Sequence, residues 1–175
     1  MCGLHSLFNG LTGRNKNKKI EDQSNKPLYK AVKAGSTKRV RNFLRKGADP
    51  NICDSHRLSP LHLAAYWGET EIVRLLLKHG AKADWDNGKG WTALHSAAVS
   101  GSLNSRKDII DMLVKAGADL DKKDKCGWTP RDYMTLWETN AEAAEKLKKY
   151  LAELEGIKPA SNTPQKPPHI NTPKH

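Results

Sequence analysis

Three glycines, Gly35, Gly68 and Gly101, recur at a constant interval of 33 residues. Around the middle glycine, residues 59–80 place a small apolar segment before a run of large aliphatic residues, which predicts two short antiparallel helices joined at Gly68. A helix pair this short cannot bury both of its faces, so it needs similar pairs on either side. The constant interval supplies such neighbours, and the sequence therefore predicts an array of stacked helix pairs.

Two of the units carry a near-complete motif, Ser59-Pro-Leu-His-Leu-Ala-Ala65 and Thr92-Ala-Leu-His-Ser-Ala-Ala98. A Gly-Ala pair follows the second helix of three units, at 47–48, 80–81 and 117–118. These motifs resemble the ankyrin repeat. The resemblance implies an all-α fold, an ankyrin-repeat solenoid of stacked helix-turn-helix units with β-hairpin-like finger loops. It also implies that His62 and His95 are structural and bond the backbone between repeats, and it places three side chains at the fingers: Asp54, Asn87 and Asp124.

The array is predicted to occupy residues 26–156. Its units cover about 26–57, 58–90, 91–127 and 128–156, and the first and last are atypical, as terminal caps are. A basic tail (1–25) precedes them and a Pro-rich tail (157–175) follows, both expected to be disordered. Four extra residues near Leu103–Arg106 are expected to lengthen the turn between the helices of the third unit. In the fourth unit, Thr139 or Asn140 is expected to cap a helix that runs to Leu154.

The charge of the chain is concentrated near its start. The net charge is +11, and 13 Lys or Arg face 4 Asp or Glu between Arg14 and Arg57. Such a balance favours acidic proteins, nucleic acid or anionic lipid as partners, although it also serves solubility alone. This leaves an alternative function open, electrostatic binding of nucleic acid or an anionic membrane through the basic N-terminal region.

The sequence offers no coherent nucleophile, metal-ligand set or phosphate loop, so we expect a non-enzymatic monomer without metal or cofactor. It shows no membrane-spanning run and no secretory signal. Its three cysteines are widely spaced, which favours a reducing compartment. The expected location is cytoplasmic, with the nucleus or the cytosol of a host cell as alternatives; a delivered effector is one interpretation of that last case.

Ankyrin arrays bind proteins mostly through a concave face, built from finger loops, the residue before each inner helix, and the ends of the inner helices. That resemblance predicts a scaffold that binds an unidentified protein, acidic if the basic first unit steers it. Tryptophans recur at these positions while aliphatic residues already fill the core spacing, which favours exposed anchors. The predicted partner-binding residues are Leu58, Tyr66, Trp67, Lys89, Trp91, Val99, Trp128 and Trp137.

Overall fold

The computed structural model describes residues 26–100, 103–136 and 141–156, so the two predicted tails lie outside the described residues. Within these ranges the chain forms four consecutive helix pairs, and the fold is all-α as predicted. The inner helices of the pairs are α2 (Pro27–Lys33), α4 (Pro60–Trp67), α6 (Ala93–Ala98) and α8 (Pro130–Leu136). The outer helices are α3 (Thr37–Arg45), α5 (Thr70–Lys78), α7 (Leu103–Lys115) and α9 (Ala141–Glu155).

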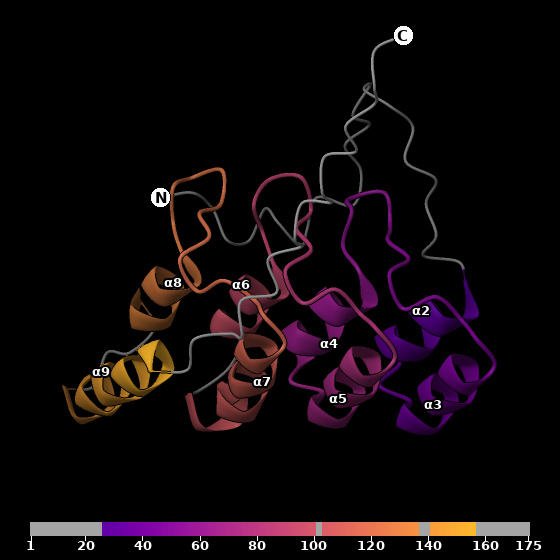
Figure 1. The fold of residues 1–175 in the computed structure, drawn as a ribbon, viewed down its shortest axis with the longest axis horizontal. Coiled ribbons are helices and arrows are strands. Elements are labelled where there is room, and N and C mark those ends of the chain that lie inside the picture. Colours follow the sequence, from indigo (N-terminus) through magenta and orange to yellow (C-terminus); the bar gives the residue numbers. More distant parts are fainter. Residues whose placement is uncertain (1–25, 101–102, 137–140, 157–175) are drawn as a thin grey trace, which may run out of the picture.

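The helices stand in two rows, with each outer helix below its inner partner (Figure 1). Each inner helix contacts the next inner helix, and each outer helix contacts the next outer helix. The loops that join successive pairs rise above the inner row (Figure 1). Each unit therefore touches chiefly its neighbours in the sequence, as expected for a repeat array.

The two central inner helices, α4 and α6, begin at a side chain that caps the backbone. The Ser59 hydroxyl lies 2.8 Å from His62 Nδ1, and the Ser59 backbone N–H donates to the same ring nitrogen at 3.2 Å. Thr92 and His95 repeat this arrangement at the start of α6. These contacts satisfy backbone donors that a helix leaves unbonded at its first turn, so the recurring motif sets where α4 and α6 begin, whereas α2 follows Lys26 without a side-chain cap.

The core lies between the rows and uses different residues in each. The inner helices α4 and α6 bury small side chains completely, whereas the outer helices α5 and α7 bury large aliphatic ones. The small side chains let adjacent inner helices approach closely, and the large ones fill the space beneath them. The residues with no exposed surface include Ala64, Ala65, Ala97, Ala98, Ile72, Leu76, Ile109 and Leu113.

The extra residues of the third unit are helical, so the prediction of a longer turn is wrong. Helix α7 begins at Leu103 and takes these residues into its first turns. Arg106 points inward from this extension with 1% of its surface exposed, and its Nη1 donates to the Ala98 carbonyl at 2.6 Å. That carbonyl belongs to the last residue of α6, so Arg106 ties the extension to the preceding helix.

The predicted final helix is present as α9, while its predicted caps at 139 and 140 lie outside the described residues. Its apolar stripe is buried at Leu147 and Leu154. Tyr150 joins this stripe, and its hydroxyl donates to Asp111 Oδ1 at 2.7 Å, which docks α9 onto α7. No helix in the described ranges has both the length and the apolar character that crossing a bilayer requires.

Candidate binding surface of the finger loops and inner helices

The three finger loops share one local structure. A carboxylate or amide oxygen accepts two backbone N–H groups, two and four residues further along the chain, at 2.8–3.2 Å. The side chains that accept are Asp54, Asn87 and Asp124, which the resemblance placed at the fingers. This arrangement is an Asx turn, and it adds to the backbone bond that closes each loop, from the N–H of the same Asx residue to the carbonyl four residues further on. Asp54 and Asp124 also accept a tyrosine hydroxyl each, from Tyr29 at 2.8 Å and Tyr133 at 2.7 Å.

Two histidines join successive units, which confirms the structural role expected for them. His62 Nε2 lies 3.1 Å from the Trp91 carbonyl oxygen, and His95 Nε2 lies 3.3 Å from that of Trp128. Nδ1 accepts at the cap, so Nε2 carries the proton in each ring. Burial lowers the pKa of His62 to about 4 and also lowers the pKa of His95, although the backbone bond opposes the shift in both. Both imidazoles are therefore neutral at pH 7.

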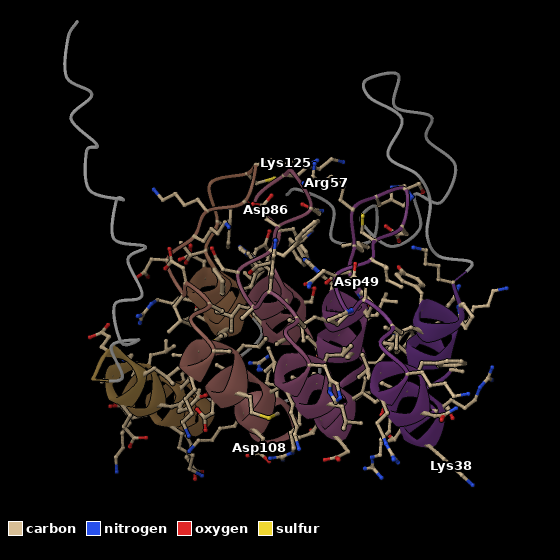
Figure 2. The ribbon with its side chains drawn as sticks, turned by 45° about the vertical axis from the view of Figure 1, so that its right-hand side comes forward. Lys38, Asp49, Arg57, Asp86, Asp108 and Lys125 are labelled. Atoms are coloured by element: carbon tan, nitrogen blue, oxygen red, sulfur yellow. The ribbon has the colours of Figure 1, made fainter. Side chains whose placement is uncertain are left out.

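The fingers also contact one another. The side chain of Arg57 on the first finger lies against Gly88 on the second, where an added Cβ would sit 3.4 Å from its Cδ. The Lys125 backbone N–H on the third finger donates to the Lys89 carbonyl at 2.8 Å. Arg57 and Lys125 accordingly appear close together at the finger ends, on the edge of the molecule away from Lys38 (Figure 2).

Acidic side chains near the second finger are paired. Lys122 Nζ lies 3.1 Å from Asp84 Oδ2 and 3.2 Å from Asp86 Oδ2. Asp86 also accepts the Gly88 backbone N–H at 2.6 Å, and these bonds lower its pKa despite the opposing effect of burial. Both carboxylates thus stabilise the loops and leave little negative charge for a partner.

At the end of α4, the predicted binding residues Tyr66 and Trp67 form an edge-to-face pair. Their ring centroids are 5.2 Å apart and the rings are inclined by 77°. Trp67 is 61% exposed, whereas Tyr66 is half-buried. The indole therefore presents a large apolar surface that the fold does not need for its core, as the sequence predicted for this residue.

The prediction that Trp91 is an exposed anchor is wrong. Only 3% of its surface is exposed, and its indole N–H donates to Ser96 Oγ at 2.9 Å. Its ring stacks on His95 at 5.2 Å and meets Tyr133 edge-on at 5.3 Å. Trp91 is therefore a core residue, because the next unit supplies Tyr133 to cover it.

The other predicted binding residues lie in several environments. Trp128 is 40% exposed and its ring contacts that of Tyr133, with the two ring centroids 5.7 Å apart. Lys89 is exposed, whereas Leu58 and Val99 are half-buried and pack against the core. Trp137 lies outside the described residues. The structure therefore leaves Trp67, Trp128 and Lys89 as the accessible members of the predicted set.

Arg57 is a finger residue that the prediction missed. Its backbone has φ +62°, a left-handed conformation that the second and third fingers give to Gly90 and Gly127 at the matching position. Its guanidinium lies over the ring of Trp85, 5.8 Å from the centroid. Aligning the three fingers by their Asx residues would have shown an arginine where the other two have glycine.

No group of three or more His, Cys, Asp or Glu side chains in the described ranges is arranged to hold a metal ion.

Comparisons with known proteins agree with the repeat architecture. A family model described as ankyrin repeats (3 copies) matches residues 4–84 and 28–124. The chain is 38% identical over 111 residues to the 2-5A-dependent ribonuclease of Mus musculus, an alignment that covers 63% of this chain and 10% of that protein. It is 46% identical over 41 residues to the human protein phosphatase 1 regulatory subunit 27, which covers 23% of this chain and 24% of that protein. The chain thus spans only a small part of either relative, but the family match extends over most of its own length: it belongs to the ankyrin-repeat family.

Proposed function

We propose that the repeat array is a non-enzymatic binding module that holds another protein against the ends of its inner helices and its finger loops. Ankyrin repeats are in general protein-interaction modules, and the family match covers repeats alone. The observation that carries the proposal is the exposure of Trp67, 61%, at the end of α4.

An exposed tryptophan of this kind has a clear energetic consequence. Its side chain lies outside the core, and removing an aromatic anchor from an interface typically costs about 2 kcal/mol or more of binding free energy. Its edge-to-face partner Tyr66 restrains the indole. A restrained aromatic side chain loses little conformational freedom on binding, so its apolar area is available to a partner at a low entropic cost.

A second candidate function is electrostatic binding of nucleic acid or anionic lipid, which the basic charge of the first unit favours. Residues 26–48 hold eight Lys or Arg and no Asp or Glu. Arg41 pairs with Glu71 of the next unit at 3.2 Å, but both side chains are about half exposed, so that pair neutralises little of the surface. Nucleic acid or anionic lipid bound here would dissociate steeply as salt rises.

The test is capture of partners from a cell lysate by the whole chain. The Tyr66→Ala/Trp67→Ala double variant is compared with the parent and with Lys78→Ala, an exposed change on the outer helix of the same unit. Proteins held by the parent and the control but lost by the double variant support the proposal. Identical captured proteins for all three overturn it.

Two further arms separate the alternatives. Repeating the capture at about 50 and 200 mM salt distinguishes an apolar anchor from electrostatic binding, because phosphate contacts weaken over that range by orders of magnitude. Isothermal titration with 2-5A asks whether the dependence stated in the name of the mouse ribonuclease extends to this chain. Saturable 2-5A binding that Trp67→Ala abolishes would replace the protein partner with a small ligand.

A further inference from the structure

We propose that Arg57, Lys89 and Lys125, here called the finger ridge, receive an acidic segment of the partner protein, and that Trp128 beside the ridge receives an apolar side chain of that segment. This inference rests on the proposed function and specifies the chemistry of its partner. It concerns the finger loops, whereas the proposed function itself depends on Trp67.

The finger ridge is continuous across three units. The side chain of Arg57 extends from the first finger to Gly88, the residue next to Lys89. The Lys89 carbonyl accepts the Lys125 backbone N–H at 2.8 Å, which fixes the second finger against the third. One cation from each finger therefore lies in sequence along the ends of the loops, where Figure 2 shows Arg57 and Lys125.

The charge of the ridge is not compensated by the protein. The finger residues 55–57, 88–90 and 125–127 contain no Asp or Glu. No ion pair joins a ridge cation to a carboxylate in the part of the chain that the structure describes. Neighbouring carboxylates are held by other donors: Asp54 and Asp124 by backbone N–H groups and tyrosines, and Asp86 by Lys122. Lys89 and Lys125 are exposed and Arg57 is half-buried, so the charge of the two lysines faces solvent. There it attracts an acidic partner and orients its approach.

Arg57 is retained at a conformational cost. A residue with a Cβ is less stable than glycine in the left-handed region, and both other fingers have glycine at this position. Among the described residues the arginine makes no ion pair; its guanidinium lies over the Trp85 ring, 5.8 Å from the centroid, and its Nε is buried without a hydrogen-bond partner. The contact with the Trp85 ring restrains the guanidinium before a ligand arrives, and a restrained planar guanidinium can bind a carboxylate through two parallel N–H bonds. Backbone strain at an otherwise unexplained residue is a mark of a functional position.

The apolar surroundings favour a protein segment over nucleic acid. Single-stranded nucleic acid is held by a series of aromatic platforms alternating with cations. Here Trp91 is buried, and Trp85 is covered by Arg57 and by Lys82, whose Nζ lies 5.6 Å from its centroid. Trp128 at 40% is the exposed tryptophan of the described fingers. A single apolar contact beside three cations fits an acidic segment with one large apolar side chain.

The test uses the whole chain and a fluorescein-labelled peptide of glutamates around a central Leu-Phe pair, followed by fluorescence anisotropy. The Lys89→Glu/Lys125→Glu variant should bind the peptide at least about tenfold more weakly than the parent. The control is Lys38→Glu/Arg39→Glu, which changes the net charge equally but lies in the first turn of α3, across the molecule from the ridge (Figure 2). Acidic side chains are favourable at a helix N-terminus, so the control is expected to fold and to keep most of its affinity.

Three results would overturn the inference. They are failure of the parent to bind the peptide, an equal loss in the control, and binding of an oligo(dT) of matched charge with the same dependence on the ridge. Circular dichroism at 222 nm and the melting temperature show whether each variant is folded. Replacing Leu-Phe by Ala-Ala in the peptide should weaken binding to the parent but not to Trp128→Ala, and equal weakening in both would remove Trp128 from the site.

The outcome is separable from that of the proposed function. If the ridge variant captures the same lysate proteins as the parent while Tyr66→Ala/Trp67→Ala loses them, the finger ridge is not the site and the proposed function stands. If both variants capture what the parent captures, the proposed function fails as well.

Discussion

Lowering the pH from 7 to 5 is expected to destabilise the array through His62. This imidazole is 2% exposed, accepts the Ser59 cap at Nδ1 and donates to the Trp91 carbonyl through Nε2. A second proton would occupy Nδ1 and remove the acceptor that the cap uses. Burial of the ring lowers its pKa from 6.5 to about 4, so the folded protein resists that proton.

The sign and size follow from proton linkage. Between pH 6.5 and 4 the unfolded chain binds a proton at His62 that the folded chain excludes, so the free energy of unfolding falls as the pH falls. With these two pKa values the loss between pH 7 and pH 5 is about 2 kcal/mol from this one residue. The pKa of His95 is lowered for the same reason, so His95 adds a loss of the same sign.

The assay is urea unfolding followed by circular dichroism at several pH values from 7 to 5. His62→Gln keeps one acceptor and one donor in a side chain that does not titrate, so it should remove about 2 kcal/mol of the pH dependence whatever its effect at pH 7. His95→Gln is the parallel variant in the next unit. A parent and a His62→Gln variant with the same slope against pH would refute the reasoning.

Three further changes test the packing. Gly90→Ala should cost about 3 kcal/mol of stability, because its Cβ would overlap the Lys123 carbonyl in a left-handed backbone. Gly80→Ala, left-handed but with open space around it, should cost only about 1 kcal/mol, and equal losses in the two urea titrations would contradict the close approach of the fingers. Trp91→Ala should cost about 3–5 kcal/mol as a buried aromatic. Trp67→Ala should change stability by less than about 0.5 kcal/mol, and the reverse order of the tryptophans in thermal melts would contradict their assigned environments.

Much of the fold follows from the sequence because each unit repeats a local pattern. The interval of 33 residues, the capped starts of α4 and α6 and the large aliphatic residues of the outer helices are all visible without coordinates. The bonds from His62 and His95 to the next unit follow from the resemblance, since they recur at one position. An array whose contacts join sequence neighbours leaves little for long-range packing to decide.

The solvent exposure of the tryptophans was determined by the tertiary structure. Trp91 and Trp128 hold the same position in successive units, yet the first is 3% exposed and the second 40%. Tyr133, which comes from the irregular fourth unit, covers Trp91, and the described structure has no further unit to cover Trp128. The motif therefore predicted the backbone position of each tryptophan but not which side chains cover its ring.

Two other features needed the coordinates for the same reason. The residues inserted near Arg106 could extend either a turn or a helix. In the structure they extend the helix, and the bond from Arg106 to the Ala98 carbonyl stabilises that arrangement. In the sequence, Arg57 does not differ from the many other basic residues. Its left-handed backbone and its contacts with Trp85 and Gly88 distinguish it, and these are known only from the structure. The sequence alone thus determined the repeat, its register and its core, because these depend on local pattern. The accessible surface was determined only by which neighbouring unit covers which side chain.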